Sequence, residues 1–328
     1  MDPSLDFTIS RRIIFNTEVF PTTPATIKYD PENPESPLPR NYETSEIDVP
    51  TLIDARPLEI GQDKWAQIYA CQMEDPRLEG QADVVLKLYQ EQYFPPRYDE
   101  EDYSIPNYES ELQSRNGATG EMTEELLAWT ETWAYARLQS LQGTCIPIFY
   151  GTYEFILPDG EVSLGIILSF VRGVDLQAYC HLVSREEKMN NWHNVARDIC
   201  VAIDKIHKLG VMHGDTRSDN IMISTPSTDD PTTSEPCHPV VTIIDFALSR
   251  SLPYRPPHHS PSANEDIFAV SEMILEVCCR TGRVDTHTRI VRRCEFYEEV
   301  KRRFPEDAWL QSPEWRDCID CGGVVPVA

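Results

Sequence analysis

Hydrophobic positions in the first half of the chain follow the patterns of strands. The segment WAQIYACQM (65–73) alternates between apolar and polar residues, and DVVLKLYQ (83–90) is a short apolar run around one lysine. IPIFYGTYEFIL (146–157) and VSLGIILSFV (162–171) are two further runs, joined by a Pro-Asp-Gly turn. Alternation and short apolar runs bounded by turn residues are typical of strands. We therefore expect four strands here.

Helical spacing interrupts this pattern once and then dominates the second half. EELLAWTETWAYARLQSLQG (124–143) and NWHNVARDICVAIDKIHKLG (191–210) repeat apolar residues at intervals of three and four, and each ends in a glycine. Such spacing and such an ending predict amphipathic helices. FAVSEMILEVC (268–278) predicts a third, and the short apolar runs NIMIS (220–224) and VVTIIDF (240–246) lie between them. Strands followed by helices predict an α+β fold with two lobes.

Composition divides the chain further. Residues 1–50 contain six prolines between positions 21 and 39, and proline breaks both helices and strand ladders, so we predict an extended or disordered lead. Residues 91–123 are acidic and rich in Tyr and Pro, which predicts a surface insertion. The first lobe is then expected to span residues 51–172, and the second residues 173–328.

Net charge and the pattern of cysteines indicate which partners and which cellular compartment to expect. The 54 acidic residues against 29 basic ones give a formal net charge of -25, which repels phosphate backbones and anionic lipids, so no nucleic acid or membrane partner is expected. The chain has no signal-peptide pattern, no apolar run of transmembrane length and ten cysteines without regular spacing, so we expect a cytoplasmic or nuclear protein with reduced thiols. The lone CxxC of Cys318 and Cys321 lacks the second pair of a zinc site.

Four widely separated groups of residues could carry chemistry. Lys87 lies within an apolar strand, where an unpaired ammonium is costly and requires an anionic partner. Glu131, on the helix that follows, is the natural candidate. The segment HGDTRSDN (213–220) comes between a helix and a strand, and Asp245 ends another apolar run.

In this order, the groups resemble the motifs of the protein-kinase-like superfamily. VVLK stands where that family has its strand-three lysine, and HGDTRSDN stands where protein kinases have HRDxxxxN and aminoglycoside-type kinases have HGDxxxxN. IDFA stands at the position of the metal-binding DFG motif, and ILSFVRGVDL looks like the hinge. NEDIFAVSEMILE resembles the helix whose aspartate, here Asp266, braces the catalytic loop. The resemblance covers roughly residues 51–280.

The resemblance implies a two-lobed fold with a small antiparallel-sheet N-lobe and a mainly helical, shortened C-lobe. It also implies an enzyme that binds ATP and Mg²⁺ and transfers the γ-phosphate to a hydroxyl group. Lys87 would hold the α and β phosphates, and Glu131 would fix its position. Asp215 would orient the acceptor hydroxyl and take its proton. Arg217 would face the γ-phosphate, and Asn220 and Asp245 would bind Mg²⁺.

The adenine pocket is implied by the same resemblance. Val85 shares a strand face with Lys87 and would line it. Ile167 and Leu168 would form its rear, and the backbone of Ser169 to Val171 would form the hinge.

Several positions depart from the family pattern. The segment LEIGQDKWAQIYA has one glycine, Gly61, where a kinase usually has three. Ala247 replaces the glycine of the metal motif, and Gly214 replaces the arginine that pairs with a phosphorylated activation loop. Only 20 residues separate Asp245 from Asp266, so most of the segment that cradles a peptide substrate is missing.

Three functions therefore stay open. A protein Ser/Thr-kinase-like phosphotransferase is favoured by the complete set of catalytic residues. A small-molecule kinase of the aminoglycoside or choline type is suggested by HGD and by the missing peptide cradle. A pseudokinase that serves as a nucleotide-binding or scaffold module is suggested by the poor glycine loop and Ala247. The expected partners are ATP and an acceptor, either a protein or a small molecule.

Overall fold

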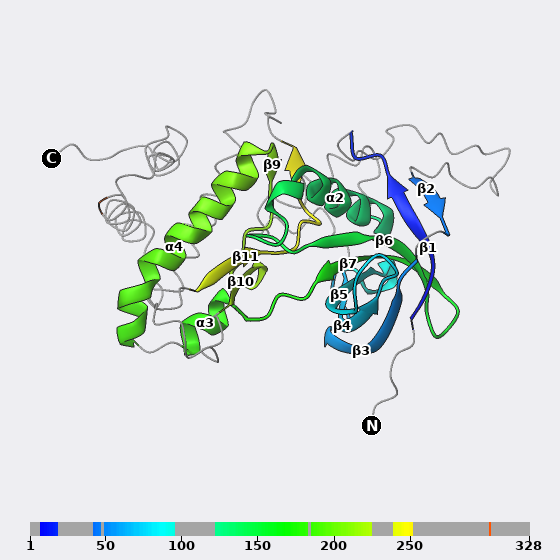
Figure 1. Ribbon diagram of the computed structural model, residues 1–328, viewed down its shortest axis with the longest axis horizontal. Coiled ribbons are helices and arrows are strands. Elements are labelled where there is room, and N and C mark those ends of the chain that lie inside the picture. The colour runs from blue at the N-terminus through cyan, green and yellow to red at the C-terminus, as the bar shows by residue number, and fades with distance from the viewer. Residues whose placement is uncertain are drawn as a thin grey trace, which may run out of the picture. The chain divides into compact units, whose positions relative to one another are not determined.

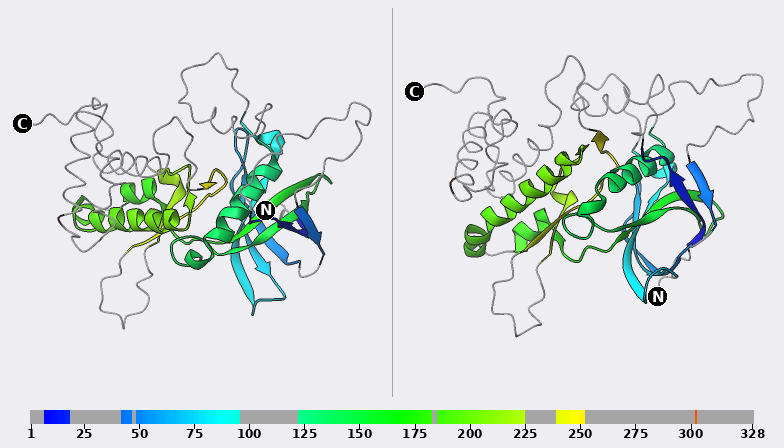
Figure 2. Two further views of the ribbon diagram at one scale, coloured as in Figure 1. Left: turned by 90° about the horizontal axis from the view of Figure 1, so that it is seen from above. Right: turned by 45° about the horizontal axis from the view of Figure 1, so that its top comes forward.

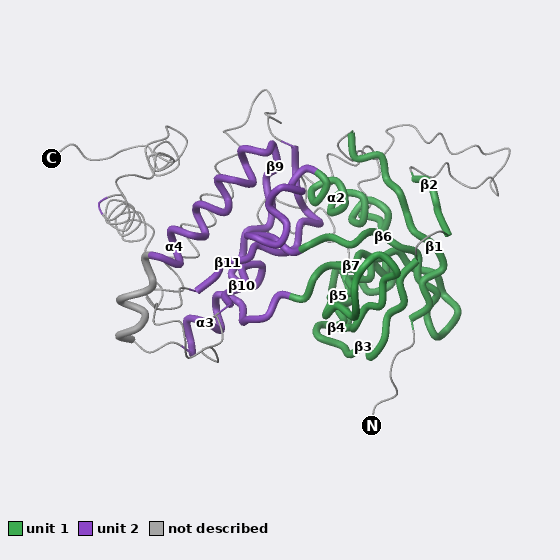
Figure 3. Tube along the Cα trace, viewed as in Figure 1, with its two compact units in different colours: residues 1–136, 148–170 green, residues 137–147, 171–328 purple. Residues whose placement is uncertain are grey.

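The computed structural model describes two compact units, which Figure 3 colours separately. The first comprises residues 1–136 and 148–170, and the second comprises residues 137–147 and 171–328. Within these ranges the structure describes residues 7–18, 42–46, 49–95, 122–182, 185–224, 239–251 and 302. The expected boundary at residue 172 lies beside the division at 170–171, but sequence did not suggest that residues 137–147 join the second unit.

The first unit is built on a seven-stranded antiparallel sheet in the order β2-β1-β6-β7-β5-β4-β3 (Figure 1). The four predicted strands are present as β4, β5, β6 and β7. The strands span Thr8–Phe15 (β1), Tyr42–Ser45 (β2), Thr51–Glu59 (β3), Gln67–Glu74 (β4), Gln81–Tyr89 (β5), Phe149–Ile156 (β6) and Val162–Ser169 (β7).

The predicted extended or disordered lead of residues 1–50 contains two strands that join the sheet. Strand β1 pairs along β6, and β2 pairs along β1. The register between β1 and β6 shifts between Ile9 and Arg11, and such a bulge breaks the alternation by which a strand is found in sequence. Ile13 and Phe15 are nevertheless buried. The prolines at 21–39 lie outside the described residues.

The sheet has two different faces because strand side chains alternate. One face holds a continuous apolar core built from Val84, Leu86 and Leu88 of β5 together with residues of β4, β6 and β7. Helix α2 (Glu124–Arg137) lies beside the sheet (Figures 1 and 2). Its Glu131 and Thr132 side chains contact Lys87 and Thr152 on the other face.

Helix α2 ends six residues earlier than the glycine signal predicted. The 3₁₀ turn η3 (Gln139–Leu141) follows Arg137. Gly143, with φ at +73°, donates its N–H to the Ile146 carbonyl in the next turn. The glycine therefore serves a loop after the helix and not its last turn. The 3₁₀ turn η1 (Glu91–Tyr93) begins the predicted acidic insertion, and residues 96–121 lie outside the described part.

The described part of the second unit contains two helices, with short strands before and after them along the chain. Helices α3 (Leu176–Leu182) and α4 (Arg185–Lys208) precede β9 (Val211–Met212) and η4 (Ser218–Asn220). A three-stranded sheet has the order β11-β10-β8, and β12 pairs with β9. These strands span Val174–Asp175 (β8), Ile221–Ser224 (β10), Val240–Ile243 (β11) and Arg250–Ser251 (β12).

Helix α4 confirms the helix that the apolar spacing of residues 191–210 predicted. Val195, Ile199, Ala202, Ile203 and Ile206 are all buried, and Gly210 follows the last turn with φ at +79°, a backbone conformation that favours glycine. The helix begins six residues before its predicted start, and the predicted helix 268–278 lies outside the described residues. Among the residues that the structure describes, an antiparallel sheet with helix α2 in the first unit and helices α3 and α4 in the second confirm the α+β class.

No helix in the described ranges is both long and apolar enough to cross a membrane.

Candidate active site

Strand β5 places Lys87 in the middle of the sheet, between Ile68 of β4 and Ile166 of β7. Its side chain is only 6% exposed, and Nζ donates a hydrogen bond to Glu131 Oε2 over 2.7 Å. Glu131 is fully buried on α2. Burial of two charges is costly, and the pair is tolerated because each neutralises the other at hydrogen-bonding distance. The two residues that sequence paired are therefore in contact.

Tyr89 completes this pair, and sequence reasoning missed it. Its hydroxyl donates to the same Glu131 Oε2, and its ring centroid lies 5.6 Å from the Lys87 ammonium. The ring and the hydroxyl are both buried on β5. Tyr89 could have been found from its spacing, because residues 87 and 89 of one strand must point to the same face of the sheet. We call Lys87, Tyr89 and Glu131 the ion-pair cluster.

Thr132 ties α2 to the sheet one residue after Glu131. Its hydroxyl donates to the Ala128 carbonyl over 2.6 Å and therefore accepts from Thr152 of β6, whose Oγ1 is also 2.6 Å away. Both hydroxyls are buried, so breaking either bond would leave a buried polar atom without its partner. This contact fixes the helix against the strand beside the ion-pair cluster.

The residues predicted to line the adenine pocket divide between the units. Val85 faces its register partner Leu168 across β5 and β7, on the Lys87 side of the sheet. Ser169 exchanges two hydrogen bonds with Ile148, through its N–H and its Oγ. The Phe170 N–H is bonded to the Asp83 carbonyl. An adenine base would therefore need the carbonyls of this segment or the amide of Val171, which begins the second unit.

The turn between β3 and β4 occupies the position of the glycine-rich loop. Gly61 has φ at +135°, and the buried Gln67 side chain binds it twice: Oε1 accepts the Gly61 N–H over 2.7 Å, and Nε2 donates to the Gly61 carbonyl over 2.9 Å. Asp63 adopts φ at +59°, where glycine is usual. A side chain thus holds the backbone at Gly61, and its amide is already bonded within the protein.

In the second unit, His213 joins the catalytic-loop motif to the Asp245 segment. Its Nδ1 accepts the Asp215 N–H over 3.2 Å, so Nδ1 carries no proton and Nε2–H donates to the Ile244 carbonyl over 2.9 Å. The ring is fully buried and packs edge-on against Phe246, with ring centroids 4.8 Å apart. The histidine is therefore a packed, hydrogen-bonded group that orients two functional segments.

Asp215 is held from both sides. Asn220 Nδ2 donates to its backbone carbonyl and to its Oδ2, over 2.8 and 3.0 Å, and Arg217 Nε lies 3.0 Å from its Oδ1. Desolvation raises the pKa of the Asp215 carboxyl, and the Asp245 charge adds to this, while Arg217, His213 and Asn220 oppose it. A raised pKa suits a group that must take up a proton.

Asp245 and Asn220 have the chemistry of magnesium ligands. Asn220 uses its amide nitrogen to bind Asp215, which leaves Oδ1 as the atom that can bind a cation. Asp245 takes the left-handed conformation with φ at +67°, and its Oδ1 accepts the Ala247 N–H over a long 3.4 Å. Two hard oxygen donors fit Mg²⁺, which completes its shell with substrate phosphates and water. No cluster of three or more His, Cys, Asp or Glu side chains forms a metal centre among the described residues.

Gly214 explains why the motif reads HGD. Its φ is +80°, a conformation that residues with a β-carbon rarely adopt. An arginine here would be strained by the backbone that the His213 and Asp215 contacts define.

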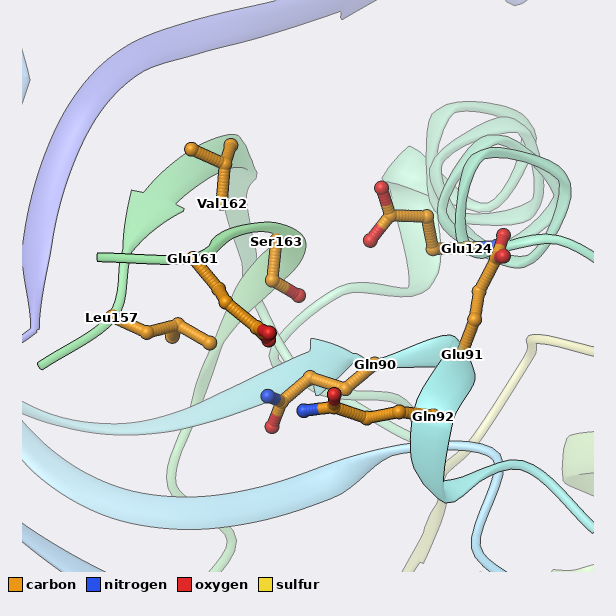
Figure 4. A pocket seen from close by; sticks show the side chains of 8 residues that line it. All are labelled: Gln90, Glu91, Gln92, Glu124, Leu157, Glu161, Val162 and Ser163. Atoms are coloured by element: carbon orange, nitrogen blue, oxygen red, sulfur yellow. The ribbon is translucent and has the colours of Figure 1, made fainter. Parts of the chain in front are cut away.

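A pocket of about 240 Å³ lies at the far end of α2 (Figure 4). It is formed by η1, the first turn of α2 and the turn before β7, and its lining residues are Gln90, Glu91, Gln92, Glu124, Leu157, Glu161, Val162 and Ser163. Burial raises the pKa of Glu124 there to about 7. None of the predicted site residues lines this pocket.

The structure thus brings the predicted residues together in two groups. Val85, Lys87, Glu131, Leu168 and Ser169 belong to the first unit. Val171, Asp215, Arg217, Asn220 and Asp245 belong to the second. Asp266 lies outside the described residues.

Comparison with known proteins supports the motif assignment. Residues 133–281 match the family model for protein tyrosine and serine/threonine kinases, a range that includes Asp215, Asn220 and Asp245 but not Lys87 or Glu131. The comparison with curated protein sequences gave no match.

Three solved structures of mutant forms of the PknI kinase domain from Mycobacterium tuberculosis are among the similar folds. They are 17%, 18% and 17% identical to this chain, with TM-scores of 0.39, 0.41 and 0.40. The likeness covers 70%, 74% and 72% of this chain and 74%, 77% and 76% of theirs. Nothing about substrate follows from such distant similarity. The family match covers the segments of Asp215, Asn220 and Asp245 and supports the resemblance to protein kinases that their motifs indicated.

Proposed function

We propose that this protein is an ATP-dependent phosphotransferase of the protein Ser/Thr-kinase type, which transfers the γ-phosphate of Mg-ATP to a hydroxyl group. The observation that carries the proposal is the buried contact between Lys87 and Glu131. These residues lie outside the range matched by the family model, so the ion pair supports a kinase site independently of that match. A fold without need of a phosphate ligand gains little from a lysine buried in an interior strand of its sheet.

Each site residue has a role in this proposal. Lys87 binds the α and β phosphates, and Glu131 and Tyr89 hold its ammonium in place. Asp215 orients the acceptor hydroxyl and takes its proton, while Asn220 fixes the carboxylate through Oδ2. Arg217 is 60% exposed and reaches Asp215, so it can turn toward the γ-phosphate and neutralise the charge that develops there.

Asn220 Oδ1 and the Asp245 carboxylate would hold Mg²⁺. When bound, the ion would neutralise charge on the phosphates during transfer. His213 keeps both ligand segments in register through its bonds to Asp215 and Ile244. Val85 and Leu168 would contact the adenine.

The proposal is tested by measuring transfer from Mg-ATP labelled at the γ-phosphate to basic proteins, peptides and small alcohols. Wild-type protein should transfer label and should melt at a higher temperature with millimolar Mg-ATP, since a ligand of the folded state stabilises it. Asp245→Asn should abolish transfer and leave the melting curve without nucleotide nearly unchanged. An unmoved wild-type melting curve together with no transfer would reject an active kinase.

Lys87→Met needs its own control, because it leaves Glu131 buried without its cation. Loss of one partner of a buried ion pair costs about 3–5 kcal/mol. The double variant Lys87→Met with Glu131→Gln removes the stranded charge. If both variants lose transfer while the double variant recovers stability, the loss is one of chemistry and not of folding.

A small-molecule kinase is the second candidate, and Gly214 favours it. The positive φ at this residue fits the HGD motif of aminoglycoside-type kinases. Transfer to small cationic alcohols, with none to proteins or peptides in the same screen, would support a small-molecule kinase.

A pseudokinase is the third candidate, and the Gln67 contacts favour it. They occupy both backbone groups of Gly61, which a phosphate-binding loop would be expected to keep available. Nucleotide-dependent stabilisation without transfer to any acceptor would select this function.

A further inference from the structure

Strand β1 contacts helix α2 as well as the sheet. The Trp129 Nε1–H of α2 donates to the carbonyl of Asn16, just beyond the end of β1, over 3.0 Å. The Phe15 ring stacks on the Trp129 indole with a centroid distance of 5.9 Å and an interplanar angle of 9°. Both rings are buried. The end of β1 is therefore a docking point for the helix that carries Glu131.

The other end of β1 is fastened to β6 through Glu154. This buried carboxylate accepts hydrogen bonds from Arg11 Nε over 2.8 Å, from Arg11 Nη2 over 2.7 Å and from Ser10 Oγ over 2.7 Å. A two-pronged arginine–carboxylate contact fixes geometry as well as charge. Strand β6 also binds α2 through Thr152 and Thr132. Strand β1, strand β6 and helix α2 thus form a closed set of contacts.

We infer that β1 is a positioning strap, defined here as residues 8–16, that holds α2 where Glu131 reaches Lys87, with Trp129 as the positioning residue. Trp129 lies two residues before Glu131, and a helix moves as a nearly rigid body over so short a span. The Lys87–Glu131 contact of 2.7 Å leaves no slack, so release of Trp129 from Asn16 would shift Glu131 out of hydrogen-bonding range. The inference rests on the role proposed above for the Lys87–Glu131 pair.

The experiment loosens the strap from each end in the full chain. Arg11→Glu places a like charge against Glu154 and so releases β1 from β6, and Arg12→Glu makes the same charge change on the opposite strand face as its control. Trp129→Leu removes the indole donor and the stacked ring, and Trp129→Phe keeps a ring for stacking. Hydrogen exchange of α2 amides should rise in Arg11→Glu and Trp129→Leu and stay near wild type in Arg12→Glu, because exchange reports local opening. Trp129→Phe should fall between these extremes.

A double-mutant cycle separates positioning from general stability. Transfer efficiency, as kcat/KM for ATP, should fall about tenfold in Trp129→Leu when Glu131 is present. In a Glu131→Gln background the same substitution should change transfer by less than about twofold, because residues that act through one another are not additive. Because Trp129→Leu by itself already weakens the Lys87–Glu131 contact, the loss of melting temperature in the double variant should also be smaller than the sum of the two single losses.

Two results would overturn the strap. One is unchanged α2 exchange in both Arg11→Glu and Trp129→Leu. The other is a full tenfold loss of transfer on top of Glu131→Gln, which would mean that Trp129 acts independently of Glu131. Absence of any wild-type transfer would instead reject the proposed function, and the exchange measurement would still decide whether β1 holds α2.

Discussion

Tyr89 shows how one residue can change the properties of an ion pair. Its hydroxyl binds the Glu131 oxygen that also receives Lys87 Nζ, and its ring lies beside the ammonium. The carboxylate therefore gains a second donor in a site that excludes water. We expect the hydroxyl to matter more than an exposed one, because hydrogen bonds to buried charges are among the stronger kinds.

The first prediction concerns this hydroxyl. Tyr89→Phe keeps the ring and should lower stability by about 1.5–3 kcal/mol, the usual range for a hydrogen bond to a charged group. It should also weaken Mg-ATP binding, because Glu131 can then turn away from Lys87. Denaturant melts and nucleotide titrations measure the two effects. Tyr150→Phe, on strand β6 of the same sheet, is the matched control, and equal effects from both variants would count against a special role for Tyr89.

The second prediction concerns Asp215. Desolvation raises the pKa of this carboxyl above the ordinary value for an aspartate, so the folded state favours its protonated form. The stability linked to that proton is complete below the ordinary pKa and is lost as pH rises through the raised one. Asp215→Asn should therefore be more stable than wild type at neutral pH, with the difference vanishing in acid. Melting temperatures across the pH range measure this.

The same carboxyl should set the acid limb of the transfer rate. A base must be ionised to take a proton, so the limb should lie above the ordinary aspartate pKa. Arg217 lowers the pKa of Asp215, and Arg217→Ala should move the limb to higher pH. A limb at an unchanged pH in this variant would show that another group controls it.

At the scale of the element, helix α2 combines structural and functional demands along its length. Its middle carries Glu131 and Thr132, which contact the sheet, and Trp129, which contacts β1. Its first turn carries Glu124, whose Oε2 accepts the Leu164 N–H over 3.3 Å beside the acidic pocket. A negative charge in the first turn of a helix is normally stabilising. Here the charged form of Glu124 is disfavoured, because the side chain is buried and lies near the carboxylates of Glu91, Glu125 and Glu154.

The third prediction follows from this first turn. Burial, followed by neighbouring carboxylates, raises the pKa of Glu124 from 4.5 to about 7. The stability contributed by its proton is present below 4.5 and is lost as pH rises through about 7. Glu124→Gln keeps an acceptor for the Leu164 N–H without the charge. Its melting temperature should exceed that of wild type at about pH 8 and match it at about pH 5.

Glu125→Gln provides the control, since it makes the same charge change one residue along the helix. If that variant shows the same pH-dependent gain, the effect belongs to net charge and not to the buried site of Glu124.

The elements themselves were predicted unequally. Strands β4 to β7 and helix α4 were recognised because their apolar patterns are regular. Strand β1 was missed because its bulge between Ile9 and Arg11 breaks the alternation, and β3 was missed because most of its side chains are exposed. The end of helix α2 was predicted too late. The residues before Gly143 form the 3₁₀ turn η3, and the Gly143 N–H bonds to the carbonyl of Ile146, three residues further along the chain.

At the scale of the whole molecule, the segment that resembles a catalytic loop lacks the arginine through which the family motif can be regulated by phosphate. Gly214 adopts a positive φ and has no side chain, whereas the arginine of the family motif can bind a phosphate with two hydrogen bonds. Ser249 is buried, and its hydroxyl donates to the His213 carbonyl. A phosphate on this segment would therefore meet no guanidinium from position 214.

The fourth prediction is that activity does not depend on phosphorylation. Transfer rates before and after complete dephosphorylation, verified by mass, should agree within about twofold. A fall of tenfold or more, equivalent to about 1.4 kcal/mol in the barrier, would show that another basic cluster reads a phosphate.

Sequence by itself predicted the candidate site of this protein more fully than its architecture. A charged residue in an apolar run, such as Lys87, must be explained by a partner, and the motif order left few choices for Glu131, Asp215, Asn220 and Asp245. These inferences depend on residue type and local spacing, which a single chain displays directly.

Tertiary structure alone decided what surrounds those residues. Three contacts illustrate this: Tyr89 and Lys87 share one Glu131 oxygen, Gln67 binds both backbone groups of Gly61, and the Trp129 indole of α2 binds the end of β1. The residues that make them are separated by between 6 and 113 positions in the sequence. Such contacts arise from sheet register and helix placement. Those in turn depend on the packing of all their neighbours, and no local pattern encodes them.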